Sequence, residues 1–232
     1  MARLPRMVLP GTPHHVTQRG NRRERIFFSD TGYALYRDLL AESCKLNGVE
    51  AWSWCLMPNH VHLILVPSTE VSLARALGET RRRYTGFINA RNRQTGHLFQ
   101  GRYGSMAMDE AHLIMAALYV AMKPVKARLV DRPDDWPWSS VRAHLAGTDD
   151  ELVRVRPRLD RAGDFAGFLD CGESDDNMTD FYQGQAIGRP PMSVDALQQL
   201  EKELGRATLP ATRGRKPRMI DGDDRQKELK NY

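Results

Sequence analysis

Two histidines, His60 and His62, lie one residue apart in the largely apolar stretch CLMPNHVHLIL of residues 55–65. Side chains two positions apart in a β-strand project from the same face, so both imidazoles would leave one surface while Val61 and Leu63 point to the other. Two neutral imidazoles on one surface can bind a divalent cation, but two ligands alone leave a metal site incomplete. On spacing alone, a structural role for the pair remains the commoner interpretation.

A second candidate for chemistry lies downstream, where Tyr119 and Lys123 are four residues apart in the mainly apolar segment 108–124. Helical residues at this spacing share a face. If such a helix lies over the histidine strand, a phenol would sit beside a bound metal, a pairing that suits attack by tyrosine on a DNA phosphodiester. Because phenol has a pKa of about 10, the resulting ester stays activated, and a second strand end can reverse it without ATP. Taken alone, Tyr119 also fits a core aromatic residue.

Seven elements that could position these groups are predicted from hydrophobic periodicity and from cap and turn residues. They follow the order strand, helix, strand, strand, helix, strand, helix, over residues 14–20, 29–48, 49–57, 59–67, 70–92, 96–108 and 108–124. The first six predict an α+β fold with a ferredoxin-like βαββαβ core. The seventh is an additional helix that carries the tyrosine, and we expect Asp109 to cap it and Pro124 to end it. Strand parity alone does not show which sheet face this helix covers.

The composition excludes several classes of protein. With 232 residues and 41% hydrophobic residues, the chain has the make-up of an ordinary soluble protein. No apolar run approaches the roughly 20 residues that a membrane span needs, and the N-terminus lacks a signal-peptide pattern. Cys44, Cys55 and Cys171 form neither a disulfide framework nor a CxxC motif, which suits a reducing compartment. We therefore expect a cytoplasmic protein that has neither a membrane partner nor a small-molecule substrate.

The positive charge of the chain favours a polyanionic partner. A net charge of +5 is weak support on its own, but basic residues cluster in three runs, QRGNRRER, ETRRRYTGFINARNR and RATLPATRGRKPR. One such run is usually solvated surface, whereas three runs tilt the interpretation toward phosphate binding. The residues expected to contact DNA are Arg19, Arg22, Arg23, Arg81, Arg82, Arg83, Arg102, Arg213, Arg215 and Lys216.

The sequence divides into three parts. Residues 1–150 hold all the predicted elements of the core and are expected to form the catalytic domain. Residues 151–187 contain the acidic stretch LDCGESDDNMTD with little apolar periodicity, and we interpret them as a linker or insertion. Residues 188–232 combine a small amphipathic helix with the last basic run and predict a DNA-binding tail.

Several of these stretches together resemble a known family. PHHVTQRGNRRERIFF, CLMPNHVHLILVP, GHLFQGRY, LYVAMKPVKARLV and DWPWSS, in this order, are similar to the REP-associated tyrosine transposases. These proteins belong to the larger group of single-tyrosine, His-hydrophobic-His transposases. The resemblance covers residues 3–148, and its most specific element is MPNHVH followed downstream by the tyrosine helix.

The resemblance implies a function and a set of site residues. It implies a ferredoxin-like core, a Mg²⁺ or Mn²⁺ ion held by His60 and His62, and Tyr119 as the nucleophile. It further implies that the substrate is single-stranded DNA bearing short hairpins, typically repeated extragenic palindromes. The protein would cleave and rejoin such strands through a 5′-phosphotyrosine intermediate. Whether it acts as a monomer or as a homodimer stays open.

One position departs from the family pattern. Where the family carries an asparagine one helical turn beyond the tyrosine, as a third metal ligand, this chain has Lys123, and a protonated ammonium has no lone pair to offer a metal. Two explanations compete. Either Lys123 contacts the scissile phosphate and partly replaces the charge of the metal, or the protein is a catalytically degenerate DNA-binding protein with a structural or regulatory role. Because both histidines and the tyrosine are present, we favour retained activity.

Overall fold

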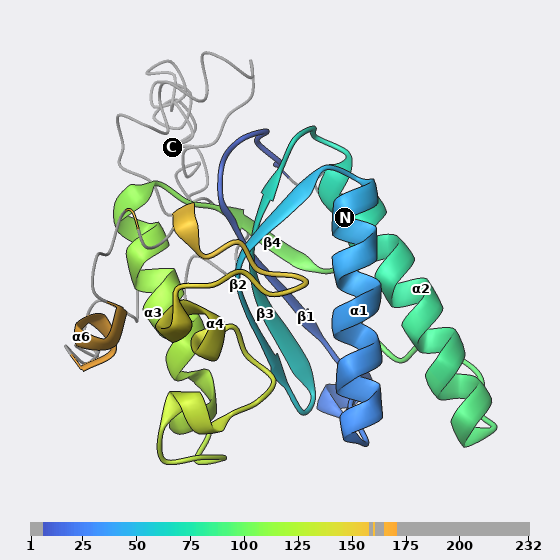
Figure 1. Ribbon diagram of the computed structural model, residues 1–232. Helices are drawn as coiled ribbons and strands as arrows, with labels where there is room; N and C mark the ends of the chain where they lie inside the picture. Colours follow the sequence, from blue (N-terminus) through green and yellow to red (C-terminus); the bar gives the residue numbers. More distant parts are fainter. Residues whose placement is uncertain (1–6, 158–159, 161–164, 171–232) are drawn as a thin grey trace, which may run out of the picture. The chain divides into compact units, whose positions relative to one another are not determined.

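The structure, a computed structural model, describes residues 7–157, 160 and 165–170 (Figure 1). Within these residues no helix is both long and apolar enough to cross a membrane. The predicted catalytic core is present as alternating strands and helices. Its elements are β1 (His14–Arg19), α1 (Asp30–Leu46), β2 (Val49–Met57), β3 (His60–Pro67), α2 (Ser72–Asn92), β4 (Gly104–Ala107) and α3 (Glu110–Lys126). Short elements η1 (Asn21–Arg23), η2 (Pro133–Asp135), α4 (Val141–Ala146) and α6 (Phe165–Asp170) complete the described chain.

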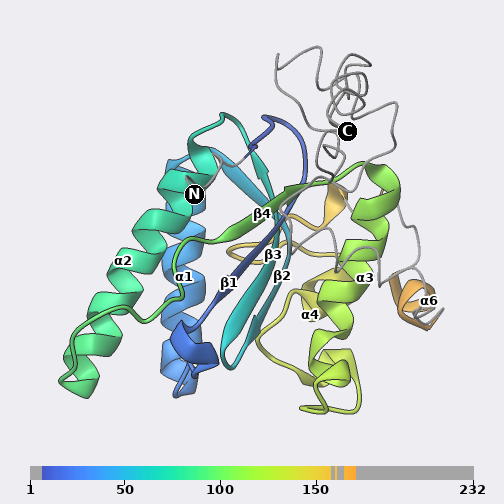
Figure 2. The same cartoon turned by 180° about the vertical axis from the view of Figure 1, so that it is seen from behind.

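The four strands form one antiparallel sheet with the order β2-β3-β1-β4. This order places the first and third strands in the centre, as the ferredoxin-like βαββαβ plan requires, and the predicted α+β fold is confirmed. Figure 2 shows β4 at the edge of the sheet beside β1. The register pairs Arg19 of β1 with His60 of β3, so the C-terminal end of β1 and the beginning of the histidine strand are neighbours.

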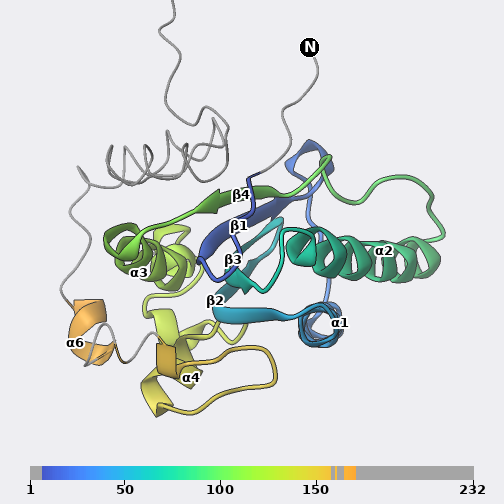
Figure 3. The same cartoon turned by 90° about the horizontal axis from the view of Figure 1, so that it is seen from above.

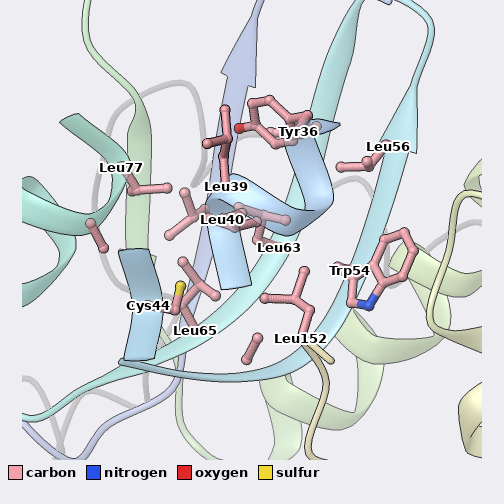
Figure 4. Close-up of a cluster of buried hydrophobic side chains, with 14 of the residues drawn as sticks. Tyr36, Leu39, Leu40, Cys44, Trp54, Leu56, Leu63, Leu65, Leu77 and Leu152 are labelled. Atoms are coloured by element: carbon pink, nitrogen blue, oxygen red, sulfur yellow. The ribbon is translucent and has the colours of Figure 1, made fainter. Parts of the chain in front are cut away.

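The two faces of the sheet are covered by different helices. Helices α1 and α2 lie on one face and α3 on the other, as the view in Figure 3 shows. The main core fills the first face, where Leu39 and Leu40 of α1 pack on Leu63 and Leu65 of β3 (Figure 4). Because side chains alternate along a strand, the residues of β3 that alternate with Leu63 and Leu65 point to the other face of the sheet, toward α3.

Helix α3 packs on a smaller second core. Ile64 of β3, Cys55 and Met57 of β2 and Leu113 and Val120 of α3 belong to this cluster, and all are nearly inaccessible to solvent. The position of α3, which strand parity left open, is therefore the face that carries His60 and His62. The two cores fix the sheet between α3 and the α1–α2 pair by burial of apolar surface on both sides.

Two predicted boundaries are wrong. The fourth strand was expected over residues 96–108, but β4 has only four residues, because the preceding stretch turns at Gly96 and Gly101, both of which have positive φ. Pro124 was expected to end the last helix, yet α3 continues to Lys126. A proline in a helix removes one N–H donor and crowds the carbonyl four residues earlier, but its own carbonyl still accepts. Here the chain is closed after Pro124 by bonds from the following residues, including Leu129 N–H to the carbonyl of Pro124 (2.9 Å).

The main core extends past residue 150, where the linker was expected to begin. Leu152, Val153 and Val155 are buried in the α1–α2 face of the core, and Val153 forms an isolated bridge with Ala51 of β2. Most of the expected linker over 151–187 and all of the expected tail over 188–232 lie outside the described residues, as does Cys171. The predicted linker and the predicted DNA-binding tail stay predictions.

Candidate active site

The two histidines of the HxH pair project from β3 toward α3. Their rings are 4.9 Å apart between centroids and nearly perpendicular, with an interplanar angle of 80°. His62 is buried, with 3% of its surface exposed, whereas His60 at the start of the strand is only partly buried. The pair therefore runs from the interior of the protein toward its surface.

A third imidazole, His15, joins them from the neighbouring strand β1. His15 and His62 are stacked, with ring centroids 5.2 Å apart and an interplanar angle of 5°, and Nε2 of His15 lies 3.1 Å from Nδ1 of His62. The preceding residue, His14, points to the opposite face, where its ring bonds the N–H of Leu9 and the carbonyl of Thr12. Of the two adjacent histidines in β1, only His15 belongs to the site.

Tyr119 of α3 lies against this cluster. Its ring is edge-on to His62, with centroids 5.3 Å apart, and to His15, with centroids 5.9 Å apart. One turn further along the helix, Nζ of Lys123 lies 3.9 Å from the centroid of the Tyr119 ring. The structure thus brings together the four residues predicted as metal ligands or catalytic groups, Tyr119, Lys123, His60 and His62. The tyrosine is 1% exposed, so the site is closed to solvent at the phenol.

The electrostatics of the site keep the imidazoles neutral. Burial, followed by the charges of Arg19 and Lys123, lowers the pKa of His60 to about 4. Burial and Lys123 lower the pKa of His15 to about 3, and burial places the pKa of His62 well below its ordinary value. Burial also lowers the pKa of Lys123 to about 8, assisted by Lys126 and Arg19 and opposed by Cys55. At neutral pH the site therefore holds three uncharged rings beside an ammonium group.

The hydrogen bonds of His60 leave one ring nitrogen available. Asn59 donates its amide N–H₂ to the carbonyl of Arg23 (2.9 Å), which orients the amide oxygen toward Nδ1 of His60 at 2.6 Å. An amide oxygen only accepts, so Nδ1 of neutral His60 carries the proton and Nε2 keeps its lone pair. Nε2 of His62 is buried and has no hydrogen-bond partner among the described residues.

The ring nitrogens of His60 and His62 form only part of a site for a divalent cation. Imidazole nitrogens of rings held at Nδ1 by another group are the usual first ligands of a metal site, and both His60 and His62 have such a contact at Nδ1. Within the described residues, however, no group of three or more His, Cys, Asp or Glu side chains could hold a metal ion. The ammonium of Lys123 acts electrostatically on both histidines, so the position expected to supply a third ligand supplies a positive charge instead.

Three of the predicted DNA contacts gather at the His60 end of the sheet. Arg19 ends β1 directly opposite His60, and Arg22 and Arg23 are exposed in the following η1 turn. Both η1 arginines have left-handed backbone angles, with φ of 52° and 63°, which holds this turn in a compact form. The amide of Asn59 connects this turn to the histidine strand, so the basic turn borders the accessible side of the site.

The arginines of α2 lie elsewhere. Arg82 pairs with Glu79, Arg83 pairs with Glu42 of α1, and Arg81 donates to the carbonyl of Gly101 (2.9 Å). Helix α2 covers the sheet face opposite the histidines (Figure 3), so the structure does not bring these side chains to the site. Arg81 and Arg82 line a groove of ≈ 600 Å³ together with the loop that contains His97 and Gln100. Arg102 is exposed just beyond this loop, and Arg213, Arg215 and Lys216 lie outside the described residues.

Two residues of the site were not assigned from the sequence. His15 lies on another strand than the HxH pair, and its place in the site needed the register of β1 against β3. Asn59 had no predicted role. The signal that could have identified it is its position directly before an HxH pair, where a short amide can reach the neighbouring ring.

Comparison with known proteins finds a family to which part of the chain is similar. Residues 11–123 match the family model described as "Transposase IS200 like", a segment that starts just before β1 and ends at Lys123. The matched segment is just under half of the 232-residue chain. It includes the whole four-stranded sheet, the histidine cluster and the tyrosine, and this similarity supports a DNA transposase-like function.

Comparison with solved structures gives one match that shares the fold and a second, weaker match. The structure of a REP-associated tyrosine transposase bound to a REP hairpin matches with a TM-score of 0.55 and 21% sequence identity, over 65% of this chain and 90% of that chain. A putative transposase from Deinococcus radiodurans R1 matches with a TM-score of 0.37 and 22% identity, over 51% of this chain and 95% of that chain. No curated protein matches the chain.

Proposed function

We propose that this IS200-like transposase domain cleaves and rejoins single-stranded DNA by transesterification at Tyr119. The observation that carries the proposal is the contact of the Tyr119 ring with His62 and His15, on the sheet face that the HxH pair shares. A phenol held against neutral imidazoles suits phosphoryl transfer, because the group that attacks the phosphate and the groups that can bind its oxygens lie on facing elements.

The reaction conserves the energy of the phosphodiester. The Oη atom of Tyr119 attacks the phosphorus atom, a new Oη–P bond forms, and the P–O3′ bond breaks. The tyrosine hydroxyl loses its proton, the departing 3′-oxygen takes one up, and the 5′-phosphate stays on the enzyme as a phosphotyrosine ester. A 3′-hydroxyl from another strand end can then reverse the step, which is how cleavage and rejoining use one residue.

A divalent cation, Mg²⁺ or Mn²⁺, would be held by Nε2 of His60 and Nε2 of His62. When bound, such an ion polarises phosphate oxygens and offsets the charge that develops in the transition state. Lys123 acts at the same place through its ammonium, which attracts a phosphate and repels a second cation. We propose that Lys123 contacts the scissile phosphate and partly takes over the electrostatic role of a metal.

Access to the phenol requires a movement. Tyr119 and His62 are buried and His60 is partly exposed, so the accessible part of the site lies at His60, beside Arg19. The proposed reaction therefore requires α3 to shift away from β3 when DNA binds. The second core that holds α3 is small, which makes such a shift less costly than a disruption of the main core.

The proposed substrate is single-stranded DNA with short hairpins of the REP type. The similar solved transposase was captured with a REP hairpin. In this chain, the basic turn formed by Arg19, Arg22 and Arg23 borders the site and offers positive charge for the backbone of the strand that enters it. The proposed recognition of DNA hairpins depends on this basic turn.

A second candidate function is DNA binding without cleavage. Lys123 stands where a third metal ligand was expected, and the phenol is inaccessible in the observed conformation. Both observations favour a catalytically degenerate protein of the same fold with a structural or regulatory role. The two candidates differ in whether a covalent protein–DNA adduct forms.

Incubation with labelled hairpin oligonucleotides from the surrounding genome, followed by denaturing electrophoresis, tests the proposal. The wild-type protein should form a covalent adduct, and Tyr119→Phe should lose it while binding largely persists. Tyr36→Phe is the matched control, because Tyr36 is equally buried but lies in the main core. An adduct that survives in Tyr119→Phe would remove Tyr119 from this role, and binding without any adduct would favour the degenerate protein.

A further inference from the structure

His15 is placed to control the state of His62. It is almost fully buried, its ring is parallel to that of His62, and its Nε2 atom is within hydrogen-bond distance of Nδ1 of His62. Two neutral imidazoles can share only one proton across this contact, so one ring donates and the other accepts. Which ring donates decides whether Nε2 of His62 carries a proton or a lone pair.

The surroundings favour His62 as the donor. If His15 donated, His62 would be protonated at Nε2, and a buried N–H without a hydrogen-bond partner among the described residues would result. The positive charge of Lys123 also acts on His62, and a nearby ammonium is compatible with a lone pair but not with a second N–H donor. With His62 as the donor, the same Nε2 atom is a ready ligand for a cation.

We propose that His15 is a positioning residue that accepts a hydrogen bond from Nδ1–H of His62 and thereby keeps Nε2 of His62 available as a ligand. This inference rests on the proposed function for its purpose, but the hydrogen bond itself does not depend on catalysis. Asn59 does the same for His60 through its amide oxygen, so each histidine of the pair is oriented at Nδ1 by a different partner. Such outer contacts fix the tautomer and the orientation of a metal-binding histidine.

The direct test is the tautomer of His62 in the metal-free wild-type protein, measured by long-range ¹H–¹⁵N NMR of ¹⁵N-labelled histidine. The expected result is a neutral His62 protonated at Nδ1, with an unprotonated Nε2. A His62 protonated at Nε2 would overturn the proposal. This measurement needs no variant and no activity, so it is decided even if substitutions at His15 prevent folding.

Variants separate positioning from packing. His15→Leu should lose the single tautomer of His62 and weaken Mn²⁺ binding by about tenfold, whereas His15→Gln, which retains an acceptor oxygen, should lie closer to wild type. His14→Leu is the matched control, since it removes the adjacent buried ring from the other sheet face and should change neither property. An unchanged His62 tautomer in His15→Leu would contradict the inference. Absence of the Tyr119 adduct with a normal tautomer would instead count against the proposed function alone.

Discussion

At the scale of single residues, the most informative position is Lys123. Its ammonium lies over the Tyr119 ring and contributes to the lowered pKa values of all three histidines of the site. An ammonium so placed lowers the affinity of the two imidazoles for a divalent cation, because like charges repel strongly where burial limits screening. It also gives the site a fixed positive charge in the absence of a metal.

Replacement of this ammonium should strengthen metal use. Lys123→Asn removes the charge and adds an amide oxygen, and we expect it to raise Mn²⁺ affinity by about tenfold and to increase Mn²⁺-dependent cleavage of single-stranded DNA. Metal titration and a gel assay measure the two effects. Lys126→Asn, which removes the same charge from the exposed end of α3, serves as the control. No gain in Lys123→Asn, or a loss, would count against the idea that Lys123 weakens a metal site.

His14 provides a residue-scale test of pH dependence away from the site. Burial lowers its pKa from 6.5 to about 4, so the folded protein disfavours the protonated ring relative to the unfolded chain. The stabilisation is fully present above pH 6.5 and is lost as the pH falls toward 4, by about 3 kcal/mol for this group. Urea unfolding at several pH values should show a smaller loss for His14→Gln than for wild type. Parallel curves for the two proteins would contradict the prediction.

At the scale of elements, helix α3 controls the site because it carries both Tyr119 and Lys123. Its first turn is capped by Asp109, whose carboxylate accepts the N–H of His112 (3.0 Å), as the sequence predicted. The cap fixes the residue at which the helix begins. It therefore also fixes the position of Tyr119, which lies about two and a half turns further along α3, relative to His62.

Loss of this cap should destabilise the protein measurably. Asp109→Ala is expected to lower the free energy of unfolding by about 1 kcal/mol, because one helix N–H loses its acceptor. Asp109→Asn keeps an oxygen at the same place and should lose much less. Chemical denaturation of the two variants beside wild type gives the comparison, and equal losses in both would show that the charge of Asp109, not its capping bond, supplies the stability.

Most elements could be predicted from the sequence, because caps and periodicity are local signals. Ser29 caps α1 and Asp109 caps α3, and the alternation around His62 identified β3 and its two faces. The length of β4 and the end of α3 were missed, because the turns at Gly96 and Gly101 and the hydrogen bonds of the last helical turn are details that periodicity does not contain. The pairs His60–His62 and Tyr119–Lys123 were predicted because the spacing within each pair is a local signal of one element. His15 required the pairing of β1 with β3, which no local pattern contains.

At the scale of the whole molecule, the arginines of η1 and those of α2 lie on two separate surfaces of the part of the chain that the structure describes. Arg19 and the η1 turn border the histidine site, whereas the arginines of α2 lie on the opposite side of the sheet and are partly neutralised by Glu79 and Glu42. Surface ion pairs of this kind contribute little to stability. Their presence does reduce the charge available to a nucleic acid, so the η1 turn is the stronger candidate for contact with the strand that enters the site.

The salt dependence of DNA binding tests this assignment. The double substitution Arg22→Ala/Arg23→Ala should weaken binding to hairpin-bearing single-stranded DNA. The slope of log affinity against log salt should become smaller by about 1.4 to 1.8, because each lost phosphate contact contributes about 0.7 on a single strand and about 0.9 on a duplex. Fluorescence anisotropy at several salt concentrations measures the slope. The substitution Lys45→Ala/Arg75→Ala removes equal charge from exposed positions of α1 and α2, on the far face, and should leave the slope close to wild type. Equal losses in the two double variants would indicate a general charge effect.

The central claim, that the Tyr119 oxygen becomes joined to DNA, is tested most directly by mass spectrometry of the protein after reaction with a hairpin substrate and digestion by nuclease and trypsin. The peptide 103–126 contains two tyrosines, Tyr103 and Tyr119, and fragmentation distinguishes them. We predict a nucleotide 5′-phosphate attached to Tyr119 and an unmodified Tyr103. Cut DNA in the absence of any modified peptide, or a nucleotide on a different residue, would contradict the account.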